Sequence, residues 1–130
     1  MIKSVTDIEQ SKRLAEILPI ESADMSYVCF GYTISATDGY TNFKYTICSK
    51  DNDGHCPEFN VPCWSLSALL EVIPKKVHVC LWRTQNEKEY IAGSSDTYIW
   101  DCEADNPIDA CVELIEKLHK EGLLWQKKKS

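Results

Sequence analysis

Cys63 is the residue whose position most favours nucleophilic chemistry. It directly precedes a predicted helix start, where the helix dipole lowers the pKa of a nearby thiol. A nucleophilic thiol also needs a general base, and no motif places His55, His78 or His119 beside it. The Cys63-Trp64 pair alone is a weak signal, and a packed loop cysteine beside a tryptophan that staples the helix is the alternative interpretation.

The segment from Cys48 to Cys63 also carries side chains that bind metal ions. Zinc takes cysteine and histidine ligands, and the segment offers Cys48, His55, Cys56 and Cys63. The closely spaced ligand pairs of structural zinc sites are missing, so coincidence in a cysteine-rich chain is the alternative. Residues 51–54 resemble part of a calcium-binding loop, but Asn60 stands where the bidentate glutamate belongs, and a polar turn is expected.

The cysteine usage indicates a reducing compartment. The seven cysteines are an odd number at irregular spacings, with no C-x-x-C pair. Residues 1–7 lack the apolar run of a signal peptide, and no apolar run approaches the roughly 18 residues that span a bilayer. We therefore expect a cytoplasmic protein without membrane attachment, whose cysteines are reduced and serve as small apolar side chains.

The charge of the chain argues against nucleic acid as a partner. The formal net charge is −6, whereas binding to phosphates requires a basic face. The acidic excess lies near the last predicted helix, and the one basic run, Lys127 to Lys129, is expected to be a solubilising tail. No cofactor-binding motif of the Walker or dinucleotide type occurs.

Three helices are predicted from their end signals. The first begins with a capping box at Thr6 and Glu9 and ends before Pro19. The second begins after Ser65 and ends before Pro74, with a wholly apolar face of Leu66, Leu69, Leu70 and Ile73. The third begins after Asn106 with Pro107 in its first turn, and Gly122 is its expected C-terminal cap; its inner face is Ile108, Cys111, Val112, Ile115 and Leu118.

The remaining elements are predicted strands in two hairpins. Residues 26–36 and 40–49 flank Asp38-Gly39, a strong hairpin signal, and residues 77–83 and 89–93 form a second pair, with a further strand at 97–102. Consecutive hairpins favour an α+β fold: one antiparallel sheet of four to five strands with three helices mostly on one face. We expect a single domain over residues 1–124, followed by a basic tail at 125–130.

The strands are expected to carry a second, aromatic face. Alternation assigns Val28, Phe30, Tyr32 and Ile34 to the helix-covered face, together with Val77, Val79 and Leu81. The opposite face would then show Tyr27 and Cys29, His78, Cys80 and Trp82, and Tyr98, Trp100 and Cys102. Aromatic residues with polar atoms are typical of interfaces, so the candidate partner surface is Tyr27, Trp82, Tyr98 and Trp100; coverage by loops is the alternative.

Two groups of residues carry a family resemblance. The first comprises residues 9–19 and 21–25; the second comprises 62–66, 68–70, 73–74, 106–111, 113 and 117–119. Together they resemble a recurrent family of small uncharacterised proteins of gut Bacteroidales and of their phages or mobile elements. The resemblance covers the three predicted helices and the turns that lead into them, and not the hairpins. It implies an intracellular bacterial protein encoded on an accessory element, and no activity comes with it.

Two hypotheses for function follow. The favoured one is a non-catalytic binding or regulatory protein that contacts another protein or a second copy of itself, with no nucleic acid, membrane or cofactor involved. Its basis is the missing catalytic constellation, the acidic charge and the aromatic second face. The alternative is a small cysteine-dependent enzyme or zinc-binding protein centred on the loop between Cys48 and Cys63.

Overall fold

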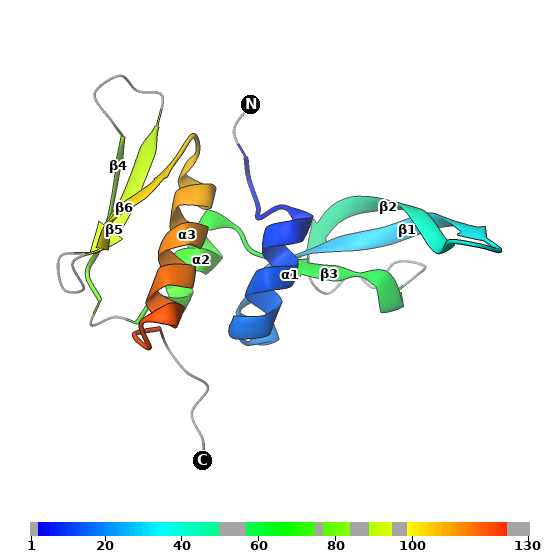
Figure 1. Cartoon of the computed structure of the whole chain (residues 1–130), viewed down its shortest axis with the longest axis horizontal. Coiled ribbons are helices and arrows are strands. Elements are labelled where there is room, and N and C mark those ends of the chain that lie inside the picture. The colour runs from blue at the N-terminus through cyan, green and yellow to red at the C-terminus, as the bar shows by residue number, and fades with distance from the viewer. Residues whose placement is uncertain (1–2, 50–56, 75–76, 84–88, 95–98, 125–130) are drawn as a thin grey trace, which may run out of the picture.

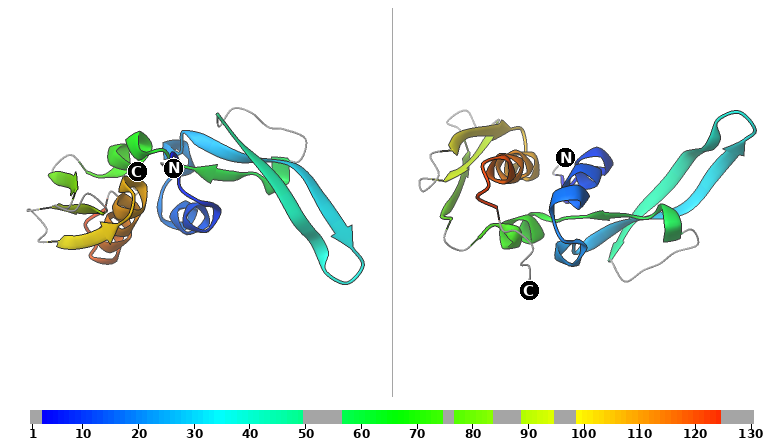
Figure 2. Two further views of the ribbon diagram at one scale, coloured as in Figure 1. Left: turned by 90° about the horizontal axis from the view of Figure 1, so that it is seen from above. Right: turned by 60° about the horizontal axis from the view of Figure 1, so that its bottom comes forward.

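The computed structural model describes residues 3–49, 57–74, 77–83, 89–94 and 99–124, and in these ranges the chain forms three α-helices and two three-stranded antiparallel sheets (Figure 1). One sheet and the helices form a body. The other sheet forms an arm that projects well away from the body, as both views of Figure 2 show. The α+β class is thus confirmed, but the strands belong to two sheets and not to one of four to five strands.

The sheet of the body consists of β4 (Val79–Arg83), β5 (Tyr90–Ser94) and β6 (Ile99–Ala104), paired in that order. Leu81 lies opposite Ala92, which lies opposite Cys102, and directly opposed residues share one face of a sheet. Ala92 and Cys102 are fully buried, and helix α3 (Pro107–Lys120) packs over this face (Figure 1). The prediction that Val77, Val79 and Leu81 face the helices is confirmed, because all three pack in the core.

Helix α3 forms as its end signals predict. The side chain of Asn106 accepts a hydrogen bond from the backbone N–H of Asp109, Pro107 occupies the first turn, and Gly122 has a positive φ of 72° just after the helix. All five residues of the predicted inner face are buried, and Ala110 and Leu114 are buried as well. The buried face is wider than predicted because α3 contacts α1 and α2 in addition to the sheet.

The arm is built around a long hairpin. Strand β1 (Met25–Ser35) turns at Asp38-Gly39 into β2 (Gly39–Ser49), as predicted, and Gly39 adopts the positive φ of 70° that such turns require. The short strand β3 (Val61–Cys63), which the sequence did not predict, pairs with the first three residues of β1. Beyond Tyr27, the described part of the arm is therefore a two-stranded ribbon.

Helix α1 (Ile8–Ile17) begins one residue later than predicted. Its N-cap is Asp7, which forms a reciprocal capping box with Gln10, so the predicted box of Thr6 and Glu9 is wrong. The hydroxyl of Thr6 is occupied elsewhere: it lies 2.7 Å from the Ser11 Oγ and accepts a hydrogen bond from the backbone N–H of Trp64 at 3.1 Å. A tertiary hydrogen bond thus uses the Thr6 hydroxyl that the local sequence pattern assigned to the N-cap of α1.

Helix α2 (Leu66–Val72) begins at the predicted cap. Ser65 accepts a hydrogen bond from the N–H of Ala68, and Pro74 follows the end of the helix. Leu69 and Ile73 are buried, but Leu70 is exposed, so the predicted apolar face is not wholly covered. The helix is only seven residues long and contacts mainly α3 and the 3-10 turn η1 (Ile20–Ser22), which leaves Leu70 at the margin of the core.

Trp64 connects the arm to the body. It lies between β3 and α2 and is fully buried. Its backbone carbonyl accepts from the N–H of Thr6 at 2.9 Å, and its indole N–H donates to the Ser22 Oγ at 2.9 Å. Trp64 therefore holds the N-terminal segment through its backbone and the turn that leads into β1 through its side chain, which fixes where the arm leaves the body.

A polar network at Asp109 joins the N-terminal segment to α3. Lys3 Nζ donates to Asp109 Oδ1 at 2.6 Å, and Gln10 Nε2 donates to the same oxygen at 2.7 Å. Asn106 Nδ2 donates to Asp109 Oδ2 at 2.7 Å. Burial raises the pKa of the Asp109 carboxyl, but these hydrogen bonds and the Lys3 charge outweigh burial, and the net pKa lies below its ordinary value.

The Asp109 network predicts a pH-dependent contribution to stability. Because the pKa of Asp109 is lower in the folded chain, its contribution is present above the unfolded pKa of about 3.9 and is lost as the pH falls through the folded pKa. Asp109→Asn should therefore lower the free energy of unfolding at neutral pH, measured by urea titration, and the difference from wild type should shrink in acid.

Glu71→Gln is the matched control for this prediction, because it removes a carboxylate from an exposed position on α2. It should change the urea midpoint little at any pH. A difference between Asp109→Asn and wild type that stays constant from neutral to acidic pH would show that the network does not depend on the Asp109 charge.

Candidate functional site

The structure places Cys63 in the core and not in an exposed site. The residue ends β3 and is fully buried. Burial, with a smaller contribution from the nearby Asp24 carboxylate, raises the pKa of its thiol to about 12. Of the histidines considered as its base, His78 precedes β4 in the other sheet, His119 is exposed in the last turn of α3, and His55 lies outside the described residues. The dipole effect predicted for Cys63 is thus outweighed by desolvation.

The proposed zinc ligands are divided by the sheet of the arm. Cys48 lies opposite Ser26, and Cys63 lies opposite Met25. Consecutive residues of β1 point to opposite faces, so the two thiols lie on different sides of the sheet and one ion could not take both. His55 and Cys56 lie outside the described residues, as do residues 51–54 of the calcium-like turn. Within the described residues, no three His, Cys, Asp or Glu side chains form a group suited to a metal ion.

The four residues of the predicted partner surface do not share one sheet. Tyr27 lies on β1 in the arm, where its hydroxyl donates to the Thr6 carbonyl oxygen at 2.7 Å. Trp82 lies on β4 in the body and is 38% exposed. Tyr98 and the side chain of Trp100 lie outside the described residues. The predicted single aromatic face therefore resolves into two separate surfaces.

The outer face of the body sheet is only partly as predicted. His78, Cys80 and Trp82 are exposed, in agreement with the expected second face. Cys102 is fully buried instead, because it lies opposite Ala92 on the side that α3 covers. Ile91 of β5 lies opposite Trp82 of β4 on one side and opposite Glu103 of β6 on the other, and Glu103 is exposed and charged. A carboxylate on the same face of the sheet makes this face a less apolar surface than the sequence suggested.

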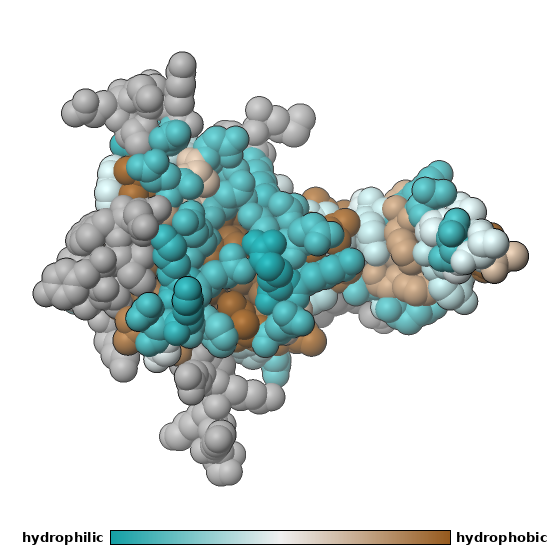
Figure 3. All heavy atoms as spheres, viewed as in Figure 1, coloured by the Kyte–Doolittle hydropathy of each residue, from teal (hydrophilic) through white to brown (hydrophobic). Residues whose placement is uncertain are grey.

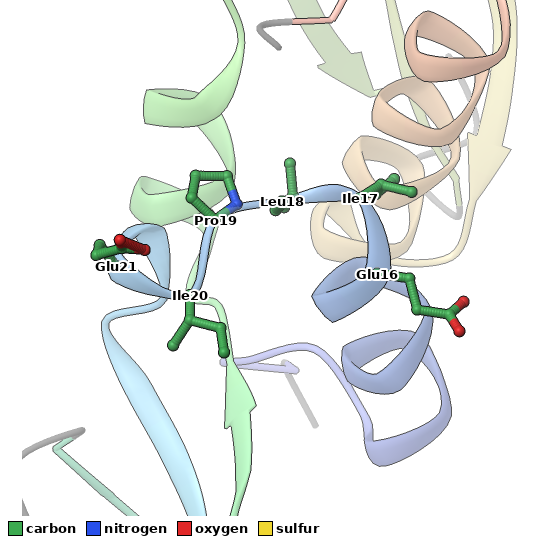
Figure 4. A pocket seen from close by; sticks show the side chains of 6 residues that line it. All are labelled: Glu16, Ile17, Leu18, Pro19, Ile20 and Glu21. Carbon is green, nitrogen blue, oxygen red and sulfur yellow. The ribbon is translucent and has the colours of Figure 1, made fainter. Parts of the chain in front are cut away.

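A surface hollow of about 520 Å³ lies where α1 leads into η1 (Figure 4). One continuous stretch of six residues, from Glu16 to Glu21, lines it. The carboxylates of Glu16 and Glu21 lie on opposite sides, so they do not form the close pair that acid–base catalysis uses. A neighbouring hollow of about 370 Å³ at the base of the arm shares Ile20 and Glu21 with it.

The arm carries a continuous strip of aromatic rings, which we call the aromatic face. Its members are Tyr27, Tyr32, Tyr40, Phe43, Tyr45 and Phe59, the last contributed by η2 (Pro57–Phe59). Neighbouring ring centroids lie 5.1 to 6.2 Å apart, within the range of favourable edge-to-face and offset contacts. The rings therefore form one surface along the length of the ribbon.

Two compensating bulges bring these rings to the same face. Between Cys29 and Gly31, β1 advances two residues while β2 advances one, from Tyr45 to Lys44. Between Gly31 and Thr33, β2 has the extra residue instead. Each bulge reverses the alternation of the side chains beyond it. Tyr32 and Ile34 on β1, and Tyr40 on β2, are thereby turned to the side of Tyr27 and Tyr45.

The bulges and the projection of the arm also correct the face predicted for β1. Val28 is buried, but Phe30 is 52% exposed and Ile34 is 67% exposed, so these residues do not share a helix-covered face. Most of β1 lies beyond the helices (Figure 2). The helices therefore cannot cover the apolar residues of the distal ribbon.

The arm differs in charge and polarity from the body. Asp38 and Lys44 are the only charged residues in residues 25–49, so this segment has no net charge although the chain carries −6. Figure 3 shows the visible face of the body as mostly hydrophilic, whereas the arm is largely pale and brown. Burial raises the pKa of Tyr27 and of Tyr45 above the ordinary value of about 10, at which a phenol is already uncharged at neutral pH. The aromatic face is thus an uncharged apolar surface with hydroxyl groups.

Sequence reasoning missed most of the aromatic face, although a signal was present. Six aromatic residues fall between Tyr27 and Tyr45, in a segment with almost no charge. Such a density of aromatic side chains in a nearly uncharged segment is typical of an interface. Simple alternation obscured it, because a bulge cannot be read from a pattern of period two.

No protein-family model matches the chain, and searches of curated proteins and of solved structures each gave no match. The resemblance to Bacteroidales and phage proteins stays a prediction. Among the described residues, no helix combines the length and apolar character needed to cross a membrane. The surfaces of this chain are therefore the features that bear on its function.

The burial of the cysteines predicts their reactivity. Burial raises the pKa of Cys63 to about 12 and that of Cys111 to about 11, whereas Cys80 is exposed. With a thiol reagent at neutral pH, followed by peptide mapping, Cys80 should be modified rapidly in the folded protein and Cys63 and Cys111 only after unfolding. Cys80→Ser should remove its modified peptide alone, and rapid modification of native Cys63 would contradict its assignment to the core.

Asn42 lies at the bulge in β2 and has a positive φ of 53°. Asparagine and glycine tolerate this left-handed conformation, whereas a β-branched residue does not. Asn42→Gly should preserve the fold, and Asn42→Val should destabilise the ribbon by about 1–2 kcal/mol. Near-UV circular dichroism of the tyrosines would show weakened ring packing in the valine variant only. Equal spectra for the two variants would mean that the bulge does not position the rings.

Proposed function

We propose that this chain is a non-catalytic protein-binding module whose contact surface is the aromatic face of the arm. The observation that carries the proposal is the continuous strip of rings on an element that projects from the body. Tyrosine and phenylalanine are enriched in the centres of protein interfaces because they provide a large contact area with few rotatable bonds.

The exposure of the distal ribbon supports a binding role. Tyr40 is 52% exposed, and Ile34, directly opposite it on β1, is 67% exposed. The ring contacts hold the ribbon in shape without covering its outer surface, so the surface is already arranged before a partner arrives. Preorganisation of this kind lowers the entropic cost of binding.

The charge distribution defines the chemistry of the partner. A segment without net charge offers no electrostatic attraction for phosphates, and the acidic remainder of the chain repels them. The partner we expect is a protein with an apolar, weakly charged contact surface that accepts hydrogen bonds from tyrosine hydroxyls. The resemblance to Bacteroidales and phage proteins supports placing this module in a bacterial cytoplasm, encoded on an accessory element.

A matched pair of isoleucine substitutions tests the proposal. Ile34 lies on the arm opposite Tyr40, and Ile20, which is 63% exposed, lies in η1 on the body. Tagged wild type, Ile34→Ser and Ile20→Ser would be used to capture partners from cells of the source organism, with quantification by mass spectrometry. Ile34→Ser should weaken capture of a stoichiometric partner by about fivefold or more, and Ile20→Ser should leave it unchanged.

Both variants replace exposed residues, so circular dichroism should show an unchanged fold. If Ile34→Ser and Ile20→Ser capture the wild-type partner equally well, the aromatic face is not the binding surface. Loss of capture with Ile20→Ser alone would move the site to the hollows beside η1.

A further inference from the structure

Strand β2 presents a long open edge. The strand order of the arm is β2-β1-β3, so within the described residues β2 has a neighbour on one side only. It spans 11 residues, contains no proline, and carries Lys44 as its only charge. Natural sheets protect long edges with prolines, charges or bulges, because an open edge offers a row of N–H and C=O groups for pairing.

Two protective features are present, Lys44 and a bulge at Asn42, and the bulge limits where pairing can occur. The bulge at Asn42 interrupts the regular backbone, which leaves the stretch from Phe43 to Ser49 as a regular edge. A two-stranded ribbon is also only marginally stable in water, and additional strands stabilise it. The edge therefore has both the geometry and a reason to take another strand.

We propose that a second copy of this chain pairs along β2, antiparallel and around a two-fold axis, so that the two arms form one continuous sheet. This inference rests on the proposed function in one respect: the joined arms present a single aromatic surface of double width. The observation that supports the dimer is the open edge of β2 and not the aromatic face. An experiment can therefore contradict the dimer without contradicting the proposed function.

The side chains of β2 define the register of this pairing. A two-fold axis perpendicular to the sheet places residues of the same face opposite one another. Pairing over the full strand would set Lys44 against Lys44 of the second copy, and like charges directly opposite are unfavourable. A shift that centres the axis on Tyr45 places Tyr45 against its own copy, Phe43 against Ile47, and Lys44 against Thr46. Aromatic pairs and aromatic–β-branched pairs are the favourable cross-strand combinations.

The charges favour a second copy at this position over contact between the bodies. Two bodies that carry the acidic excess repel each other at short range, whereas residues 25–49, which form the paired strands of each arm, have no net charge. In the shifted register, the Ser49 positions of the two copies are separated along the strands by about 26 Å. This distance exceeds the screening length of about 8 Å at physiological ionic strength. Antiparallel arms therefore join the copies while keeping the acidic bodies apart.

Substitutions of opposite charge at Thr46 test the proposal, with sedimentation equilibrium as the measurement. Thr46 is exposed, and the register places it against Lys44 of the other copy. Wild type should dimerise reversibly, Thr46→Glu should tighten the dimer several-fold through two new charge pairs, and Thr46→Lys should weaken it several-fold. General repulsion between chains of net charge −6 would give the reverse order. A double variant, Lys44→Glu with Thr46→Lys, exchanges the charges and should restore the dimer.

Three outcomes would overturn the inference. The first is a wild-type chain that stays monomeric at the highest concentration that sedimentation can measure. The second is a dimer that Thr46→Glu weakens and Thr46→Lys tightens. The third is a dimer whose dissociation constant neither Thr46 variant changes, but which Trp82→Glu dissociates. That result would place the contact on the outer face of the body sheet. A monomer that still captures its partner through Ile34 would leave the proposed function intact.

Discussion

The structure depends on the burial of Trp64 at the point where the arm joins the body. Its indole fills the centre of the junction, and its backbone and indole N–H bind the N-terminal segment and the turn before β1. Because the N-terminal segment also reaches α3 through Lys3, one buried residue links elements that are distant in sequence.

The arm shows how local irregularity creates a surface. Regular alternation would place Tyr32 and Tyr45 on opposite sides of the ribbon, and each side would then be half aromatic. One extra residue in β1 and one in β2 each turn the side chains beyond the bulge to the other face. Because the two bulges compensate, Met25 still pairs with Ser49 and Ser35 with Gly39. The rings stabilise the ribbon by their mutual contacts, and the same rings remain open to solvent on their outer side. In the proposed function, the rings that stabilise the ribbon are also the rings that contact the partner.

The sequence predicts the elements well and their assembly less well. Signals that act within a few residues, such as the Asn106 cap, Pro74 and the Asp38-Gly39 turn, each specify the local structure that forms. Thr6 shows the limit: its hydroxyl fits a local cap, but a backbone N–H 58 residues later in the chain takes it instead. The division into two sheets and the bulges in the arm are also long-range outcomes. The aromatic face depends on these long-range outcomes. The density of aromatic residues in the sequence indicated an interface, but simple alternation assigned residues of β1 to the wrong face.

The 106-residue separation between Lys3 and Asp109 has a consequence for the order of events during synthesis. The body can close only when α3 has left the ribosome, because Asp109, the partner of Lys3, is made 106 residues later. The hairpin of the arm, by contrast, is complete by Ser49 and needs only contacts between near neighbours in sequence. A nascent chain therefore exposes its aromatic strands well before its core exists. Whatever meets the arm, a partner or a chaperone, can do so cotranslationally.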